Sequence, residues 1–288
     1  MIQPLLEPND FISLAKEKEL ILIDARQGPK ALEEYQHEHL AGALHVDLET
    51  DLAAVPNNAA HGGRHPLPSP EQFGAFLGKL GITPASHVVI YDDKSGANAA
   101  ARFWWMLKAV GHQHVQVLNG GLKAALEAGA QTSSGVSNPT EVAPYPATSW
   151  QSPTADSEEV AQAAGDKNHL VIDVRDAYRY LGESEPIDPV AGHIPGAVNV
   201  PLTGNLGPEG CFLSPDDLKQ KYKAVLKDVD PENVIVHCGS GVTACHTLLA
   251  LESAGLKGAK LYVGSWSEWC RSNRPIAVGE DTSAGEKG

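Results

Sequence analysis

The second half of this 288-residue chain repeats the first half, segment by segment and in the same order. Five pairs of segments match: Leu20–Arg26 with His169–Arg175, His39–Val46 with His193–Val200, Leu67–Phe73 with Leu213–Leu218, Val88–Asp92 with Val234–Cys238, and Val117–Gly121 with Leu261–Ser265. The spacing between the halves is nearly constant, since Cys238 follows Asp92 by 146 positions and Gly264 follows Gly120 by 144. Such a repeat indicates that one structural unit is built twice.

Each half alternates short apolar strands with helical stretches, a pattern typical of a mostly parallel sheet covered by helices on both faces. We therefore predict an α/β fold with two such domains, at residues 1–130 and 158–278. Residues 131–157 are rich in Ser, Thr, Pro and Ala and are predicted to form an extended linker. Residues 279–288 are predicted to be a disordered tail.

The composition limits the classes of partner and compartment. The net charge is −14 and the pI is near 5.2, which disfavours a nucleic acid or an anionic membrane as a partner. The sequence shows neither a secretory signal nor about 18 consecutive apolar residues, and a cytoplasmic protein is predicted. No Cys-x-x-Cys pair or usual ligand spacing occurs, so reduced thiols are predicted, with no metal site and no cofactor. The four cysteines are Cys211, Cys238, Cys245 and Cys270.

The loop that begins at Cys238 is predicted to connect the buried strand 234–237 to a helix. Ligands of open α/β sheets bind at this position, where the helix also supplies free N–H groups and the positive end of its dipole. Gly239 and Gly241 allow successive backbone amides to converge on one point, as in an anion-binding nest. These dipoles, rather than a neighbouring Lys or Arg, are expected to favour the Cys238 thiolate and to stabilise a persulfide anion on it.

Three segments carry a resemblance to a known family: Gly192–Ala197, Cys238–Ala244 and Gly264–Trp269. Over nearly its whole length the chain resembles the rhodanese superfamily, in particular its tandem-domain sulfurtransferases. The segment from Cys238 to Ala244 resembles the active loop of 3-mercaptopyruvate sulfurtransferases. Asp92 stands where the first half would need its cysteine, which resembles the catalytically inactive N-terminal domain of the tandem family.

The resemblance implies a two-step transfer, in which Cys238 takes a sulfur atom from a small anionic donor and passes it to a thiophilic acceptor. Cyanide, a thiol or a thioredoxin-like reductant is the implied acceptor. Covalent catalysis of this kind divides one difficult transfer into two easier ones. Ser240 is expected to hydrogen-bond the donor or to hold a proton, and the Thr243 side chain is expected to cap the helix. The loop residues implied in donor binding are Gly239, Ser240, Gly241, Val242 and Thr243.

Arg179 matches by position an arginine that binds the anionic donor in the tandem family. A guanidinium binds a carboxylate or a sulfonate through two parallel hydrogen bonds. Where mercaptopyruvate enzymes tend to have a second arginine, this chain has Ile187 and Asp188, which weakens the expected carboxylate clamp. The loop from Cys238 to Thr243 has no basic residue, whereas thiosulfate enzymes usually have basic residues there. We favour 3-mercaptopyruvate as the donor, with thiosulfate as the alternative.

His39 is a further candidate, because it corresponds to a first-domain histidine suggested to lie near the catalytic cleft in mercaptopyruvate enzymes. Two other classes of function remain open. A Cys-dependent phosphatase would need an arginine after the five loop residues, where this chain has Ala244. A non-enzymatic persulfide carrier would use Cys245 as a resolving thiol, although a position about two turns into the helix predicts a core residue.

Overall fold

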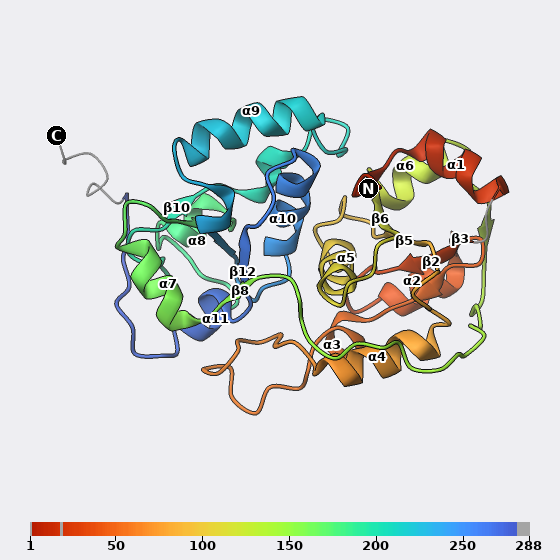
Figure 1. Cartoon of the computed structure of the whole chain (residues 1–288), viewed down its shortest axis with the longest axis horizontal. Coiled ribbons are helices and arrows are strands. Elements are labelled where there is room, and N and C mark those ends of the chain that lie inside the picture. Colours follow the sequence, from red (N-terminus) through yellow and green to blue (C-terminus); the bar gives the residue numbers. More distant parts are fainter. Residues whose placement is uncertain (1, 18–19, 281–288) are drawn as a thin grey trace. The chain divides into compact units, whose positions relative to one another are not determined.

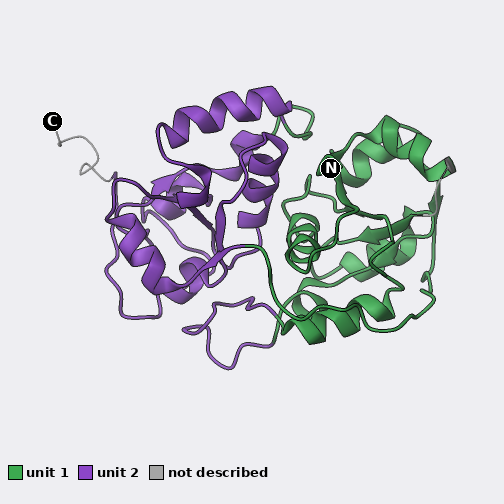
Figure 2. Ribbon diagram, viewed as in Figure 1, with its two compact units in different colours: residues 1–54, 68–152, 206–212 green, residues 55–67, 153–205, 213–288 purple. Residues whose placement is uncertain are grey.

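The computed structural model describes residues 2–17 and 20–280, which form two compact units (Figure 2). Of the described residues, unit 1 contains 2–17, 20–54, 68–152 and 206–212, and unit 2 contains 55–67, 153–205 and 213–280. The predicted tail lies outside the described residues, except for its first two positions. Each half of the sequence thus contributes one short segment to the unit formed mainly by the other half.

Unit 1 is built around a five-stranded parallel sheet of order β1-β6-β5-β2-β4. Its strands are β1 Leu5–Leu6, β2 Ile21–Asp24, β4 Leu44–His45, β5 Val88–Tyr91 and β6 Val115–Leu118. Its helices are α1 Pro8–Glu17, α2 Ala31–His37, α3 Leu48–Asp51, α4 Pro70–Lys79, α5 Ala100–Ala109 and α6 Gly121–Glu127. A separate antiparallel pair joins β3 His39–Leu40 to β7 Thr132–Ser133.

Unit 2 repeats this architecture, with a parallel sheet of order β8-β12-β11-β9-β10. Its strands are β8 Thr154–Ala155, β9 Leu170–Asp173, β10 Val198–Asn199, β11 Val234–His237 and β12 Lys260–Tyr262. Its helices are α7 Ser157–Ala164, α8 Ala177–Tyr180, α9 Pro215–Leu226, α10 Ala244–Ser253 and α11 Ser265–Trp269, with 3₁₀ turns η1 Leu202–Asn205 and η2 Pro231–Asn233. The strand order matches that of unit 1 position by position, so the predicted duplicated α/β fold is confirmed.

Helices cover both faces of the sheet in unit 2 (Figure 1). On one face, Val160 of α7 and Trp266 and Trp269 of α11 pack against buried residues of the strands, including Ile235 and Tyr262. On the other face, α10 packs against β11 and β12 and is itself covered by α9. The strand β11, which leads to Cys238, is completely buried and pairs with β9 and β12. A rigid, buried strand therefore positions the first residue of the loop.

Residues 55–67 have no helix or strand and lie on unit 2 (Figure 2). The amide of Gly62 donates a hydrogen bond of 2.8 Å to Oε1 of Glu268 on α11. Gly63 has φ +77°, and a β-carbon there would lie 2.4 Å from the carbonyl oxygen of Gly264. Only glycine permits this close backbone contact. The segment therefore places its next residues, Arg64 and His65, in unit 2.

Within residues 2–17 and 20–280, none of the helices has both the length and the apolar character that crossing a bilayer requires.

Candidate active site

The loop after β11 is anchored through the carbonyl groups of its first two residues. The amide of Trp266 donates to the carbonyl oxygen of Cys238 at 3.0 Å, and the amide of Ser267 donates to that of Gly239 at 2.8 Å. In a trans peptide the N–H points opposite to the C=O. Since both carbonyls point toward α11, the amides of Gly239 and the next residue, Ser240, point away from it, on the side available to a bound anion.

Three amides of the loop have no partner among the described residues. Within the described ranges, no protein group accepts a hydrogen bond from the amides of Gly239, Ser240 or Val242. Gly241 makes this backbone course possible, because it has φ +75° and a β-carbon there would lie 2.4 Å from the carbonyl oxygen of Val263. The arrangement resembles the anion-binding nest expected from the sequence. Cys238 itself is buried, with 1% of its surface exposed.

Thr243 differs from expectation. It precedes α10 with φ −71° and ψ −14°, and its side chain makes no capping hydrogen bond. An N-cap normally has extended backbone angles, from which its side chain reaches the amides of the first turn. Thr243 already has helical angles, and the first turn is closed instead by backbone bonds from Cys245 to Val242 and from His246 to Thr243. The prediction that its side chain caps the helix is wrong.

Ser240 forms a hydrogen-bonded pair with a histidine that the sequence analysis missed. Its Oγ lies 2.7 Å from Nδ1 of His65, and Ser240 is buried while His65 is half-buried. His65 lies 175 positions earlier in the chain and reaches the loop through residues 55–67. The pair can pass a proton between the solvent side and a molecule bound at the loop.

Arg179, the predicted donor-binding residue, lies at the loop. Its Nη2 and Nη1 are 3.5 and 3.8 Å from the position that a β-carbon of Gly239 would occupy. Its Nε and Nη2 donate to the two carboxylate oxygens of Glu185, at 3.0 and 2.7 Å, which leaves Nη1 for a ligand. Burial alone would lower the pKa of the guanidinium, but the charges of Glu185, Asp188 and Cys238 raise it above its ordinary value.

A second guanidinium, that of Arg64, lies at the same loop residue. Its Nη2 is 3.4 Å from the β-carbon position of Gly239, and its Nη1 is bonded to the carboxylate of Asp188. Backbone dipoles, rather than a neighbouring Lys or Arg, were expected to stabilise the thiolate. In the structure, two guanidiniums also lie at the loop, and that of Arg64 was not predicted because Arg64 is distant from Cys238 in the sequence.

Asp188 lies where mercaptopyruvate enzymes tend to have a second arginine. Here its carboxylate forms ion pairs with arginines. Its buried side chain accepts hydrogen bonds from Arg64 and from Arg271, the latter at 2.7 Å, and Nη2 of Arg179 lies 3.8 Å away. Burial would raise the pKa of this carboxyl group, but Arg64 and Arg271 hold it below its usual value. Asp188 is therefore a charged counter-ion in the site.

Beneath the loop, a chain of ion pairs connects the sheet to Arg179. Asp173, at the end of β9, binds Arg175 through both carboxylate oxygens, with a shortest distance of 2.6 Å. Nη1 of Arg175 in turn donates to Glu185 at 3.2 Å. Burial lowers the pKa of His237, the residue before Cys238, so a neutral imidazole precedes the loop. This network fixes the position of Glu185 and, through it, of Arg179.

The corresponding loop of unit 1 contains an internal anion. The carboxylate of Asp92 accepts hydrogen bonds from four backbone amides, at 2.8 to 3.3 Å. These amides belong to Lys94, Gly96, Asn98 and Ala100. The equivalent loop of the repeat thus binds an anion through its backbone, and in unit 1 the protein itself supplies that anion.

His39 lies in unit 1 and is hydrogen-bonded there. Its Nδ1 is 2.7 Å from the carbonyl oxygen of Tyr35, its Nε2 is 2.9 Å from the hydroxyl of Ser133, and its ring stacks on that of Tyr35. The histidine that contacts the Cys238 loop is His65. Cys245, expected in the core, is fully buried in α10.

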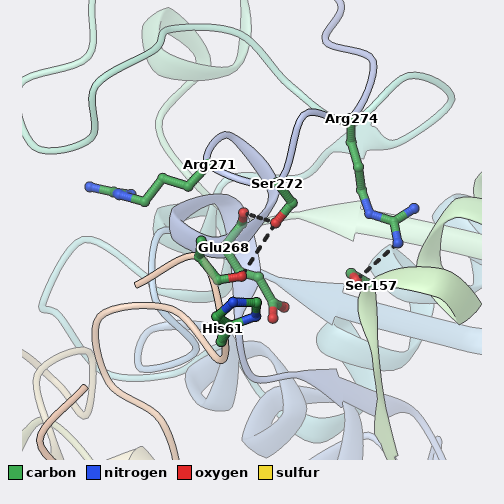
Figure 3. Close-up of a pocket in the computed structure, with 7 residues that line it drawn as sticks. His61, Ser157, Glu268, Arg271, Ser272 and Arg274 are labelled. Carbon is green, nitrogen blue, oxygen red and sulfur yellow. Dashed lines mark hydrogen bonds between the residues drawn. The ribbon is translucent and has the colours of Figure 1, made fainter. Parts of the chain in front are cut away.

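A surface pocket lies beside α11 in unit 2 (Figure 3). Its lining residues are Ala60, His61, Ser157, Glu268, Arg271, Ser272 and Arg274. In the pocket, Arg274 donates to Ser157 at 3.1 Å, while Arg271 points away from His61 and Glu268. Cys238 and Arg179 are not among the lining residues. The pocket is separate from the loop and shares with its network only Arg271.

Comparison with known proteins defines the class to which this fold and loop belong. The model of the rhodanese-like domain matches residues 7–128 and 156–272. A protein of Pseudomonas aeruginosa named probable 3-mercaptopyruvate sulfurtransferase is 40% identical over 287 residues, covering 96% of this chain and 98% of its own length. Rat thiosulfate sulfurtransferase is 37% identical over 85% of this chain and 82% of its own. The structure of 3-mercaptopyruvate sulfurtransferase from Leishmania major has a TM-score of 0.82 and 30% identity, covering 95% of this chain and 75% of its own.

The chain belongs to the rhodanese family and contains two copies of its domain. The predictions of a tandem rhodanese fold and of a sulfurtransferase are confirmed by these matches.

Proposed function

We propose that this protein transfers a sulfane sulfur from a small anionic donor to a thiophilic acceptor through a persulfide on Cys238. One observation carries the proposal: the buried Cys238 begins a loop in which the amides of Gly239, Ser240 and Val242 have no partner in the described part of the chain and at which the guanidinium of Arg179 lies. Such a site favours a sulfur nucleophile and stabilises the anion that forms when a second sulfur atom is added.

With 3-mercaptopyruvate as donor, the Cys238 thiolate attacks the sulfur of the donor. The new S–S bond forms while the donor's C–S bond breaks, and the electron pair of that bond goes to carbon. The carbon takes the proton that the donor thiol releases, so the products are the Cys238 persulfide anion and pyruvate. Ser240 and His65, bonded at 2.7 Å, are placed to carry this proton from sulfur to carbon.

In the second step the acceptor attacks the outer sulfur of the persulfide. The S–S bond breaks, the electron pair returns to Cys238 as a thiolate, and the acceptor leaves with the sulfur atom. Cyanide would leave as thiocyanate and a thiol as its own persulfide. A dithiol reductant of the thioredoxin type would release the sulfur as hydrosulfide and leave as a disulfide.

We favour 3-mercaptopyruvate over thiosulfate because residues 239–243 carry no basic side chain and because a Ser–His pair suits a reaction that needs a proton at carbon. Thiosulfate releases sulfite without such a proton transfer and remains the alternative donor. The chain's similarity to relatives named for each substrate supports both choices.

We further propose that unit 1 is catalytically silent and that the enzyme works in the cytoplasm. Asp92 occupies the anion-binding loop of unit 1 with its own carboxylate. All four cysteines are free thiols, which suits a reducing compartment.

The test is a comparison of kcat/KM for 3-mercaptopyruvate and thiosulfate, with cyanide as acceptor, in the native protein and in two variants. Cys238→Ser should abolish transfer from both donors. Arg179→Ala should lower kcat/KM for the preferred donor about 10- to 100-fold, since it removes charge-assisted hydrogen bonds to the anion. Residual turnover by Cys238→Ser would overturn the mechanism, and a persulfide without turnover of any small donor would identify a carrier.

A further inference from the structure

We propose that Arg64 is the second half of the donor clamp and that, together with Arg179, it binds the carboxylate of a thiol-bearing 2-oxo acid. This inference rests on the proposed function and assigns a specificity-determining residue to it. Arg64 comes from residues 55–67, in the first half of the sequence, and the structure places this segment on unit 2.

The two guanidiniums converge on one point of the loop. Nη2 of Arg64 lies 3.4 Å and Nη1 of Arg179 lies 3.8 Å from the β-carbon position of Gly239. Neither nitrogen has a hydrogen-bond acceptor among the described residues, because Arg64 uses Nη1 for Asp188 and Arg179 uses Nε and Nη2 for Glu185. Each arginine is thus bound by a carboxylate and has a further N–H group near the loop that donates to no described residue.

Guanidiniums outnumber carboxylates around the clamp. Four guanidiniums, those of Arg64, Arg175, Arg179 and Arg271, are connected by ion pairs to three carboxylates, those of Asp173, Glu185 and Asp188. Apart from the Cys238 sulfur, these side chains carry one excess positive charge. Two guanidiniums facing the same point repel each other, and a bound carboxylate removes that repulsion while accepting a hydrogen bond from each.

The location of the clamp favours a carboxylate over the sulfonate of thiosulfate. In thiosulfate the charged oxygens are bonded to the atom that carries the transferred sulfur, so they must lie directly at the Cys238 sulfur. In mercaptopyruvate two carbon atoms separate the transferred sulfur from the carboxylate. The guanidiniums meet at Gly239, one residue beyond Cys238, and consecutive α-carbons are about 3.8 Å apart. We take this point, rather than the sulfur itself, as the position of the bound carboxylate.

The segment that carries Arg64 is held firmly enough to act as part of a binding site. The amide of Gly62 is bonded to Glu268, and Gly63 lies against the backbone of Gly264. His65, the next residue, is bonded to Ser240 in the loop itself. Arg64 is therefore bracketed by contacts on both sides.

The experiment compares Arg64→Ala and Arg64→Lys with the native full-length protein, and uses Arg274→Ala as a matched control. Arg274 lies in the same unit and pairs with Glu158, away from Asp188. Two quantities are measured: KM and kcat for mercaptopyruvate and thiosulfate, and the dissociation constant of pyruvate, by calorimetry, as a probe of carboxylate binding that needs no turnover.

We expect Arg64→Ala to raise the KM for mercaptopyruvate and the Kd for pyruvate about 10- to 100-fold, with kcat/KM for thiosulfate changed less than about threefold. Arg64→Lys should fall between the native protein and Arg64→Ala, since it keeps the charge but loses the planar fork. Arg274→Ala should match the native protein. If Arg64→Ala does not fold, the same two quantities are compared between Arg64→Lys and the native protein, and the KM for mercaptopyruvate and the Kd for pyruvate should both be raised in Arg64→Lys.

Unchanged pyruvate affinity in the Arg64 variants, or equal losses for the two donors, would overturn the inference. If either of these results is found and the native protein still forms a Cys238 persulfide, the inference about Arg64 is wrong but the proposed function is not affected. A native protein that forms no persulfide with either donor would overturn both.

Discussion

In the proposed mechanism, Ser240 and His65 carry the proton that mercaptopyruvate cleavage requires at carbon. Their side chains are bonded at 2.7 Å, and Ser240 lies two residues from the sulfur nucleophile. Thiosulfate cleavage needs no such proton. The two donors should therefore respond differently to the loss of this pair.

We predict that Ser240→Ala lowers kcat for mercaptopyruvate by about 100-fold and changes kcat for thiosulfate much less, because general acid–base catalysis contributes at least about this much. Steady-state kinetics with both donors measures the difference. His65→Ala should have the same effect, and the double variant should be no slower than either single one, since the two residues act as a unit. Additive losses would contradict the shared role.

At the corresponding loop of unit 1, burial raises the pKa of Asp92 to about 6, against the stabilising effect of its amide hydrogen bonds. Between about pH 4 and pH 6 the folded protein then keeps a proton that the unfolded chain has released. Stability must fall as the pH rises through this window, by about 1.4 kcal/mol for each unit of pKa difference.

We predict that Asp92→Asn removes this part of the pH dependence. Urea unfolding at pH 4.5 and pH 7 should show a larger loss of unfolding free energy in the native protein than in the variant. Equal losses in the two proteins would show that Asp92 does not titrate in this range.

At the scale of elements, the course of the loop between β11 and α10 depends on Gly241. We predict that Gly241→Ala destabilises the protein by about 2 kcal/mol or more and abolishes sulfur loading, because the β-carbon would both strain the backbone at φ +75° and collide with the carbonyl of Val263. Denaturant unfolding and a persulfide assay measure the two effects.

Gly255, which follows the end of α10, is the control for this prediction. It has the same φ of +75°, but a β-carbon there would meet no atom within 4 Å. Gly255→Ala should cost about 1 to 2 kcal/mol from backbone strain and leave activity unchanged. Loss of activity in this variant would show that strain alone, and not the collision at Val263, explains the effect of Gly241→Ala.

The repeat predicted the inner strands of both sheets because it preserves the alternation of apolar strands and helices that defines them. The edge strands β1 and β8 lie outside the matched segments, and β8 lies in residues 131–157, which were predicted to be a linker. The position of the loop between strand and helix was visible in the sequence, since Cys238, Gly239 and Gly241 lie within four residues of one another. Arg64 and His65 were missed because their contacts with the loop arise only when a distant segment folds onto unit 2. A signal was nevertheless present: Val46 and Ser69 are 23 positions apart, whereas their counterparts Val200 and Ser214 are 14 apart. The extra residues contain the Gly-Gly-Arg-His run.

The capping role assigned to Thr243 failed for a different reason. A threonine before a helix is a favourable N-cap only with extended backbone angles. The tight turn after Gly241 has already placed Thr243 in the helical region. Backbone angles in such a loop follow from its tertiary contacts and not from the local preference of one residue.

At the scale of the whole molecule, the two copies of the domain differ in the groups that surround the equivalent loop. Unit 2 presents amides, two arginines and a thiol, and unit 1 fills the same type of loop with the carboxylate of Asp92. The first half still contributes to catalysis in our proposal, because residues 55–67 supply Arg64 and His65. A variant lacking this segment should lose both donor binding and the proton route while keeping Cys238.

The most direct test is the mass of the intact protein after incubation with mercaptopyruvate and removal of the donor. We predict that each native chain gains the mass of one sulfur atom, that the atom is located on Cys238, and that cyanide removes it. Cys238→Ser should gain none. Sulfur bound to Cys238→Ser, or more than one cyanide-labile sulfur atom on each native chain, would contradict the account.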